Sequence, residues 1–294
     1  MGPHMAHRKI SKARSRRGDG KPLRPGEGVV AILKEIGNHQ LKVVGTGFLL
    51  TRYGTFATAR HVLDDLADYQ SNTLCPSYIF QDGSSDGCFF RRIVGISVSN
   101  TADVGIGQVE NGAGSTNNLE LQNLRGPIAL TRPKIGEALV SYAYPENAIL
   151  DFRIQAESPY AGDVPLEQLP TLAGRYIHGK FLSQIDAGSR PFIPYPHYET
   201  SLEIRSGASG CPIFNASGRI VAIACRGWDF QGGEYEGDDL SSVVPVTQLL
   251  PLELGCIRIP HNSWEFLQVP PSRRASTLTF AELITYGHVD VGAL

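Results

Sequence analysis

The sequence predicts an all-β protein made of two antiparallel six-stranded β-barrels and a short C-terminal helix. Short apolar stretches rich in Val, Ile and Phe are separated by turn residues, among them 32 Gly and 19 Pro, which is typical of all-β proteins. These stretches come in two successive series of about six, and helical periodicity is scarce. Two such series without long intervening helices favour two packed barrels over an alternating βαβ sheet.

The first series of strands is expected in the N-terminal part of the chain, with Gly, Asn, Asp or Pro clusters between most of its members. The predicted strands are 29–34, 41–50, 56–58, 77–80, 88–98 and 104–109. The Asn- and Gly-rich stretch 111–126 is expected to end the first barrel or to begin the connector.

The second series follows this connector. Its predicted strands are 138–144, 149–156, 175–185, 198–204, 211–214, 219–225 and 243–246. Near the C-terminus, Thr279 and Glu282 have capping-box spacing for a helix through about Tyr286, with Gly287 as its stop.

The domain organisation that we expect has four parts. They are a basic disordered tail (1–27), an N-terminal barrel (28–134), a C-terminal barrel (135–252) and a C-terminal extension (253–294). Within the tail, residues 1–5 (MGPHM) resemble a remnant of an expression vector and are set aside.

The cysteines indicate a reducing compartment. Cys75, Cys88, Cys211, Cys225 and Cys256 are odd in number and lack C-x-x-C spacing, so they predict neither a complete disulfide framework nor a zinc site. The chain has no run of about 18 apolar residues, and its N-terminus lacks the apolar region of a signal peptide. We therefore expect a cytoplasmic protein with no membrane partner, no metal and no cofactor.

The N-terminal tail is strongly basic. Between residues 8 and 24 it carries eight Lys and Arg residues and a single acid, Asp19. Such an arm can contact nucleic acid or an acidic partner. The alternative, which we favour, is a solvated extension that aids solubility.

The sharpest chemical motif is GASGCP at 207–212. A serine on a glycine-rich turn can expose its hydroxyl while the neighbouring backbone N–H groups converge on one point, which is the geometry of an oxyanion hole. Gly and Ser are also ordinary turn residues, so the motif alone is weak.

Two further segments supply the groups that a serine nucleophile needs, a base and a partner that orients the base. TARH at 58–61 follows a short apolar strand and carries His61, and TADVGI at 101–106 carries Asp103. Taken singly, His61 reads as a partly buried histidine and Asp103 as a surface turn residue.

Together, these segments resemble the chymotrypsin-like (trypsin-like) serine peptidases, which show T-A-x-H, D-V/I-x-I/L and G-x-S-G-x-P in that order. The resemblance runs from about residue 28 to about residue 250. It implies the chymotrypsin-like fold and a serine endopeptidase, a hydrolase that forms an acyl-enzyme intermediate. Ser209 would be the nucleophile, His61 the general base and Asp103 the group that orients it. The N–H groups of Gly207 and Ser209 would bind the oxyanion.

Three positions depart from the family pattern. Ala208 stands just before the nucleophile, where secreted digestive relatives carry an acid that pairs with a freshly cleaved N-terminus, so zymogen activation of that type is not expected. Cys211 stands in place of a second glycine after the serine, where it either crowds the site, is redox-sensitive or is a small buried thiol, the reading that we favour. Arg60 replaces a small residue beside the base.

The resemblance also suggests a substrate-binding set. Glu203, six residues before the serine, would lie near the base of the specificity pocket, and Arg226 and Gly227 match a pocket wall. A Glu203 that faces inward would favour Lys or Arg before the cleaved bond. If Arg205 or Arg226 neutralises it, that preference disappears.

A rival hypothesis is a catalytically idle binding module that keeps the fold and acts through a groove or the basic arm. We prefer the enzyme because all three catalytic residue types are present in order. Its partners would be protein or peptide substrates. A stand-alone cytoplasmic peptidase also needs restraint, through a regulatory partner, a deformed resting site or a narrow substrate range.

Overall fold

The computed structural model describes most of the segments for which strands are predicted. The described residues are 26–37, 40–51, 54–68, 71, 73–81, 89–110, 127–144, 149–151, 172–190, 193–227, 240–254 and 278–291. The basic tail up to residue 25 lies outside them, so the disordered arm remains a prediction. The four-part domain division likewise remains a prediction.

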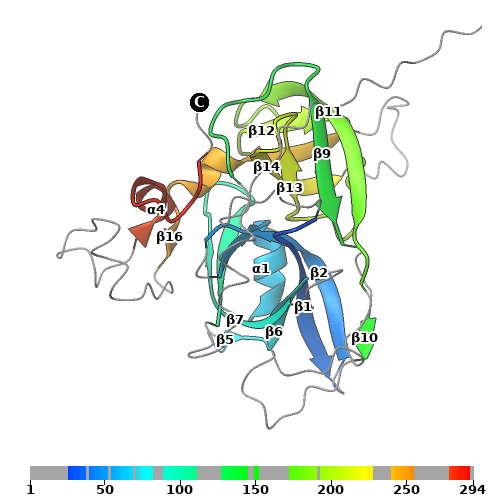
Figure 1. Ribbon diagram of the computed structural model, residues 1–294, viewed down its shortest axis with the longest axis vertical. Helices are drawn as coiled ribbons and strands as arrows, with labels where there is room; N and C mark the ends of the chain where they lie inside the picture. The colour runs from blue at the N-terminus through cyan, green and yellow to red at the C-terminus, as the bar shows by residue number, and fades with distance from the viewer. Residues whose placement is uncertain are drawn as a thin grey trace, which may run out of the picture.

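The first barrel is closed and antiparallel. Its six strands are β1 (Val29–Gly37), β2 (Gln40–Leu49), β3 (Thr55–Thr58), β6 (Ser77–Gln81), β7 (Phe89–Val98) and β8 (Gly105–Val109). They pair in the order β1-β6-β7-β8-β3-β2, and β1 pairs with β2 to close the ring. In Figure 1 this barrel forms the lower half of the molecule.

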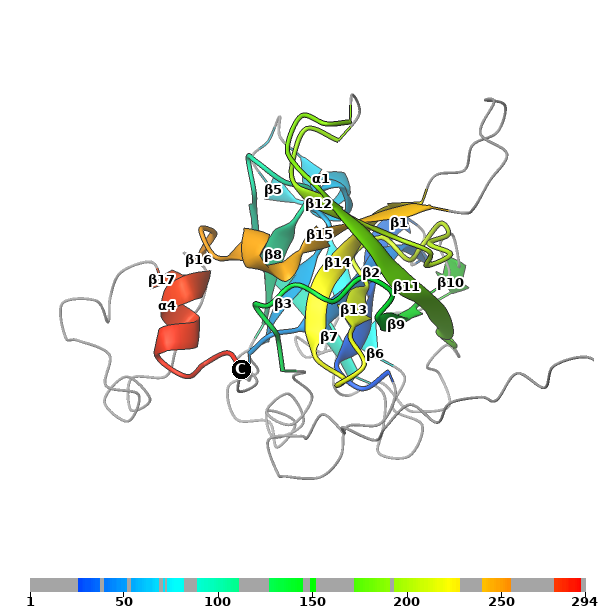
Figure 2. The ribbon, with the colours of Figure 1, turned by 90° about the horizontal axis from the view of Figure 1, so that it is seen from above.

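The second barrel is also closed and antiparallel. Its strands are β9 (Ala138–Ala143), β11 (Arg175–Ile185), β12 (His197–Thr200), β13 (Pro212–Phe214), β14 (Ile220–Gly227) and β15 (Ser241–Pro245). They pair in the order β11-β12-β15-β14-β13-β9, and β9 pairs with β11. Figure 2 shows this barrel from above. The predicted all-β fold of two six-stranded barrels is therefore confirmed.

One strand of the second series joins the first barrel instead. β10 (Ile149–Asp151) pairs antiparallel with the start of β2, Ile149 opposite Lys42. The reason is topological: β9 already pairs with β11 on one side and β13 on the other, so the second ring is complete without β10. The rest of the predicted strand, 152–156, lies outside the described residues.

Apolar side chains fill each barrel. Buried members of the first core are Val30, Ile32, Phe48, Phe56, Ile79 and Ile106. Those of the second are Leu139, Ile177, Phe181, Leu202, Ile213 and Val221. Burial of side chains of this size, each contributing about 1.5–3 kcal/mol, fixes the two barrels as rigid supports for the loops between them.

A short helix that the sequence analysis did not predict follows β3. α1 (Arg60–Leu66) buries Val62, Leu63 and Leu66 against the first core. Its two turns are too short to show a clear helical period in the sequence, so the sequence pattern predicts a turn there and no helix. After it come two short strands, β4 (Ala67–Asp68) and β5 (Thr73–Leu74), which pair with each other.

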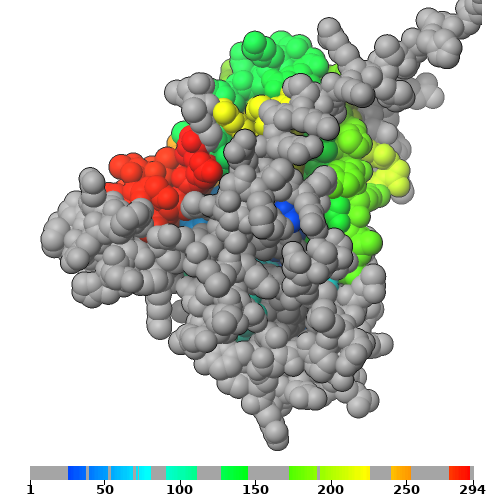
Figure 3. Space-filling view, in the orientation of Figure 1, coloured from blue at the N-terminus to red at the C-terminus, as the bar shows by residue number. Residues whose placement is uncertain are grey.

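The C-terminal elements pack beside the barrels. β15 ends at Pro245, and the predicted strand end at residue 246 is instead the first residue of a 3₁₀ helix, η3 (Val246–Leu249). β16 (Glu253–Leu254) pairs with β17 (Leu278–Thr279), and α4 (Phe280–Thr285) follows. Phe280 and Leu283 of α4 are buried in the first core, while other α4 atoms form part of the surface in Figure 3.

The predicted C-terminal helix is confirmed in its capping chemistry. The Thr279 hydroxyl accepts a hydrogen bond from the Glu282 backbone N–H (3.2 Å), and the Glu282 carboxylate accepts one from the Thr279 N–H (2.8 Å). Gly287, with φ of 72°, follows the helix end. In the part of the chain that the structure describes, no helix has the length and apolarity to span a membrane.

Candidate active site

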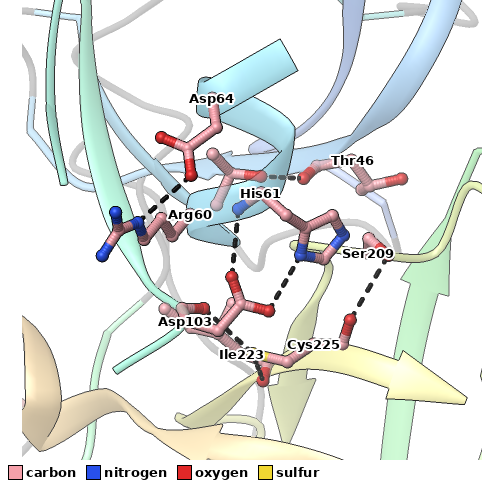
Figure 4. A network of polar contacts seen from close by, with 9 residues as sticks. Thr46, Arg60, His61, Asp64, Asp103, Ser209, Ile223 and Cys225 are labelled. Atoms are coloured by element: carbon pink, nitrogen blue, oxygen red, sulfur yellow. Dashed lines mark hydrogen bonds and ion pairs between the residues drawn. The ribbon is translucent and has the colours of Figure 1, made fainter. Parts of the chain in front are cut away.

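Three residues from distant segments meet where the two barrels face each other (Figure 4). His61 lies in the first turn of α1 and Asp103 in the turn before β8, both on the first barrel. Ser209 lies in the loop between β12 and β13 of the second barrel. The imidazole of His61 lies between the Asp103 carboxylate and the Ser209 side chain.

Asp103 holds His61 at two points. Its Oδ2 lies 2.8 Å from His61 Nδ1, and its Oδ1 accepts a hydrogen bond from the His61 backbone N–H at 3.0 Å. Because a carboxylate only accepts hydrogen bonds, Nδ1 is the donor and Nε2 of the neutral ring carries the free lone pair. The Asp103 side chain is 13% exposed and that of His61 is 42% exposed, so the acid is shielded while the ring stays accessible.

The backbone bond to His61 also caps α1. The N-cap residue, Ala59, has no side chain that can accept a hydrogen bond, and helix N-termini leave their first N–H groups unsatisfied. Asp103 supplies the missing acceptor from another segment and places its negative charge at the positive end of the helix. Helix start and imidazole are thus fixed by the same carboxylate.

Ser99 shapes the turn that carries Asp103. Its hydroxyl accepts hydrogen bonds from the N–H groups of Thr101 and Ala102, both at 3.1 Å. Its own N–H donates to the Val104 carbonyl at 2.9 Å. These local bonds stabilise a tight turn just before β8.

Arg60 connects this turn to α1, which explains the presence of a long basic side chain at this position. Its guanidinium donates to the Ser99 carbonyl at 2.7 Å and to the Asp64 carboxylate, one helical turn on, at 3.1 Å. The small residue that the family shows here could make neither contact. Arg60 therefore links the helix that carries His61 to the turn that carries Asp103.

The loop of Ser209 consists of two tight turns that share Ala208. The N–H of Ala208 donates to the Arg205 carbonyl and the N–H of Cys211 to the Ala208 carbonyl, both at 3.0 Å. Each turn has a glycine with positive φ at its third position, as type II turns require: Gly207 (89°) and Gly210 (87°).

Gly210 also brings this loop against the first barrel. A Cβ atom at this position would lie 2.0 Å from Thr58 Oγ1 and 2.1 Å from the Thr46 carbonyl oxygen. No side chain fits at such distances, so the close approach of the two barrels beside Ser209 depends on glycine here.

The loop leaves two amides without a partner. The N–H groups of Ala208, Gly210 and Cys211 donate to backbone carbonyls. Within the described part of the chain, the N–H groups of Gly207 and Ser209 make no hydrogen bond. These are the two N–H groups that the family resemblance predicts as oxyanion donors, and both are available to bind an anion.

The Ser209 hydroxyl points to the second barrel in this structure. It donates to the Cys225 carbonyl at 3.5 Å, and no hydrogen bond to His61 is found among the described contacts. The Cys225 thiol in turn donates to the Asp103 carbonyl at 3.1 Å. Catalytic hydrogen bonds are often long in ligand-free sites, and rotation about one side-chain bond redirects a hydroxyl.

Cys211 is a buried thiol. It is fully buried and its Sγ accepts a hydrogen bond from the Ser141 hydroxyl at 2.8 Å. Burial raises its pKa to about 12, although the Ser141 hydrogen bond acts in the opposite direction. The thiol is therefore protonated over the working range of an enzyme, which agrees with the interpretation as a small buried thiol.

We expect Cys211 to resist iodoacetamide at pH 9 in the folded protein, because roughly one thiol in a thousand is ionised there. Partly exposed Cys75 should react under the same conditions, and both should react in denaturant. Mass spectrometry of the alkylated peptides measures this, and rapid native labelling of Cys211 would contradict it. The same pKa shift destabilises the folded state between about pH 8.5 and 12, since only the unfolded chain then releases the proton.

The structure describes only Glu203 of the predicted substrate-binding side chains, so this set remains a prediction. Glu203 forms an ion pair with Arg205, and their side chains are 53% and 60% exposed, respectively. Arg226 and Gly227 lie at the end of β14, and the Arg226 side chain is outside the described part. Among the described residues, no cluster of three or more His, Cys, Asp or Glu side chains could hold a metal ion.

More than half of the chain matches the model of a known protein family. Residues 45–223, which are 179 of the 294 residues, match the trypsin-like peptidase domain family. This segment includes all three residues of the cluster. No curated protein sequence matches the chain.

Several solved structures resemble the fold at low sequence identity. Deg5 shows 16% identity over 75% of this chain and 84% of its own, with a TM-score of 0.47. An inactive serine-to-alanine mutant of Rv3671c from M. tuberculosis H37Rv shows 14% identity over 76% and 83%, with a TM-score of 0.47. The serine endoprotease from Yersinia pestis shows 15% identity over 76% and 60%, with a TM-score of 0.46.

Proposed function

The chain belongs to the trypsin-like peptidase domain family, and from this premise we propose that it is a serine endopeptidase that cleaves peptide bonds through an acyl-enzyme intermediate. The observation that carries the proposal is the 2.8 Å contact between His61 Nδ1 and Asp103 Oδ2 on an imidazole that faces Ser209. The N–H groups of Gly207 and Ser209, which make no hydrogen bond among the described residues, support it.

Each group of the cluster has a defined role in the proposed reaction. Ser209 Oγ attacks the carbonyl carbon of the substrate while His61 Nε2 takes the hydroxyl proton. Asp103 keeps Nδ1 protonated and stabilises the imidazolium that forms. The N–H groups of Gly207 and Ser209 stabilise the oxyanion, at about 3–4 kcal/mol per donor.

The reaction then runs through a covalent intermediate. The imidazolium donates its proton to the leaving amine, which departs and leaves an ester on Ser209. Water, deprotonated by His61, attacks this ester; the bond to Ser209 Oγ then breaks, the imidazolium returns the proton to Oγ, and the carboxylic acid product is released. Before the first step, the Ser209 hydroxyl must leave the Cys225 carbonyl and turn to His61 Nε2.

Labelling with a fluorophosphonate tests this function, because the reagent needs both an activated serine and an oxyanion site. We expect one label per chain, on Ser209, and none in Ser209→Ala. The matched control is Ser206→Ala, which removes an exposed serine from the same loop and should label normally. Equal labelling of the parent chain and Ser209→Ala would overturn the proposal.

The ion pair between Glu203 and Arg205 leads to a prediction about substrate preference. Because Arg205 neutralises Glu203, peptides with Arg or Leu before the cleaved bond should be hydrolysed at rates within about threefold of each other. Arg205→Ala should free the carboxylate and raise the relative rate for Arg about 10-fold, while Arg190→Ala, at a separate ion pair, should not. If the ratio of the Arg rate to the Leu rate is unchanged in Arg205→Ala, Glu203 does not act in the specificity pocket.

Two other proposals rest on the sequence. We place the enzyme in the cytoplasm on its cysteine pattern. The binding-module hypothesis would be favoured if Ser209→Ala kept cellular activity while deletion of residues 6–25 abolished it. Comparison of protein termini in cells expressing the parent chain or Ser209→Ala would identify substrates.

A further inference from the structure

Thr46 of the first barrel donates two hydrogen bonds to the nucleophile loop of the second barrel. We propose that Thr46 is a positioning residue that orients the two oxyanion-binding amides; the inference rests on the proposed function. Thr46 lies on β2 and is fully buried. Among the described hydrogen bonds, none joins Thr46 to Ser209 Oγ or to the His61 ring, so its effect on catalysis would pass through the loop.

Thr46 binds two carbonyl groups of this loop. Its hydroxyl donates to the Gly207 carbonyl at 2.7 Å, and its backbone N–H donates to the Ser209 carbonyl at 2.8 Å. The second contact joins β2 directly to the backbone of the nucleophile residue.

These bonds complete the anchoring of two peptide planes. In a trans peptide the C=O and N–H groups point in opposite directions from one rigid plane. In the plane after Gly207, Thr46 binds the C=O and Arg205 accepts the N–H of Ala208. In the plane after Ser209, Thr46 binds the C=O and Ala224 accepts the N–H of Gly210 at 2.7 Å.

The free amides lie on the neighbouring peptide planes. The N–H of Ser209 belongs to the plane between the two anchored ones. The N–H of Gly207 belongs to the plane just before the first. The plane between the anchored ones is also held at its C=O, because the Cys211 N–H donates to the Ala208 carbonyl at 3.0 Å. Anchoring of the flanking planes restricts the rotation of both free N–H groups and so orients them before any substrate binds.

The Thr46 hydroxyl is also held in place itself. Its oxygen accepts a hydrogen bond from the Tyr144 N–H at 3.0 Å, and the Thr46 carbonyl accepts one from the Thr58 hydroxyl at 2.7 Å. A valine has the same shape but neither donor nor acceptor, so it would leave the buried Gly207 carbonyl unsatisfied. Such a group is expected to turn towards water, and glycine permits that rotation.

The test compares Thr46→Val with Thr46→Ser and with Thr55→Val. Thr55 is another fully buried threonine of the first barrel, whose hydroxyl binds Gln108 at 2.9 Å, away from the loop. We expect Thr46→Val to lower kcat about 10- to 100-fold with little change in KM. Thr46→Ser should restore most of the rate, and Thr55→Val should lose stability but keep kcat.

Two peptide ligands separate positioning from general damage. A peptide aldehyde forms an adduct whose oxygen occupies the oxyanion site, whereas a reduced-amide peptide has no such oxygen. Thr46→Val should weaken aldehyde binding by the factor lost in kcat and leave reduced-amide binding unchanged. Equal losses of affinity for both ligands, or no loss for the aldehyde, would contradict the positioning role of Thr46 without affecting the proposed function. Absence of aldehyde binding to the parent chain would overturn the proposed function with it.

Discussion

Replacement of His61 by alanine is expected to lower kcat about 10⁶-fold, and Ser209→Ala should cost about the same. The reason is that the two side chains act as one unit: a hydroxyl without a base is inert, and a base without the hydroxyl has nothing to activate. The double variant should therefore be no slower than either single variant.

Steady-state hydrolysis of a fluorogenic peptide by the two single variants and the double variant measures this. His178→Ala is the matched control, since it removes an exposed histidine from β11 and should leave kcat unchanged. Multiplicative losses in the double variant would show that the two side chains act independently and would contradict the proposed triad.

Replacement of Asp103 by asparagine is expected to lower kcat about 10⁴-fold near neutral pH. Asparagine keeps an oxygen that can accept the His61 backbone N–H, so the cap of α1 is preserved. Its NH₂ group, however, would donate to Nδ1 and leave the ring proton on Nε2. In that tautomer His61 cannot take the proton of Ser209.

Thermal unfolding separates the two roles of this carboxylate. Asp103→Asn should unfold close to the parent temperature, whereas Asp103→Ala also loses the cap, which is typically worth about 1 kcal/mol. Asp65→Asn, at a half-exposed acid of the same helix, should change neither activity nor stability appreciably. An Asp103→Asn variant with near-parent kcat would show that Asp103 does not orient the base.

The strand pattern of the fold could be predicted because apolar alternation and turn residues act locally. β11, for example, matches its prediction at both ends, 175 and 185. What the pattern lacks is pairing information, so 149–151 was assigned to the wrong barrel, and α1 was missed because its two turns bury only three residues. Tertiary context, not local propensity, decides such short elements.

The cluster was predictable for a similar reason. His61, Asp103 and Ser209 stand in motifs whose order along the chain carries information, and the structure brings the three side chains to one place. Thr46 and Cys225 were missed because they act on backbone groups of distant segments. Ser99 acts on the N–H groups of its own turn, and serine is too common in turns for its role to stand out. The GTGF sequence at 45–48 was the available signal, but no spacing rule assigns a buried threonine to a carbonyl in another barrel.

A crystal structure of the protein with a peptide boronic acid tests the central claim most directly. The proposed enzyme predicts a covalent bond from boron to Ser209 Oγ, with one boronate oxygen about 2.7–3.1 Å from the N–H groups of both Gly207 and Ser209. His61 Nε2 should lie within hydrogen-bond distance of the adduct. An unmodified Ser209, or an adduct whose oxygens contact neither amide, would contradict it.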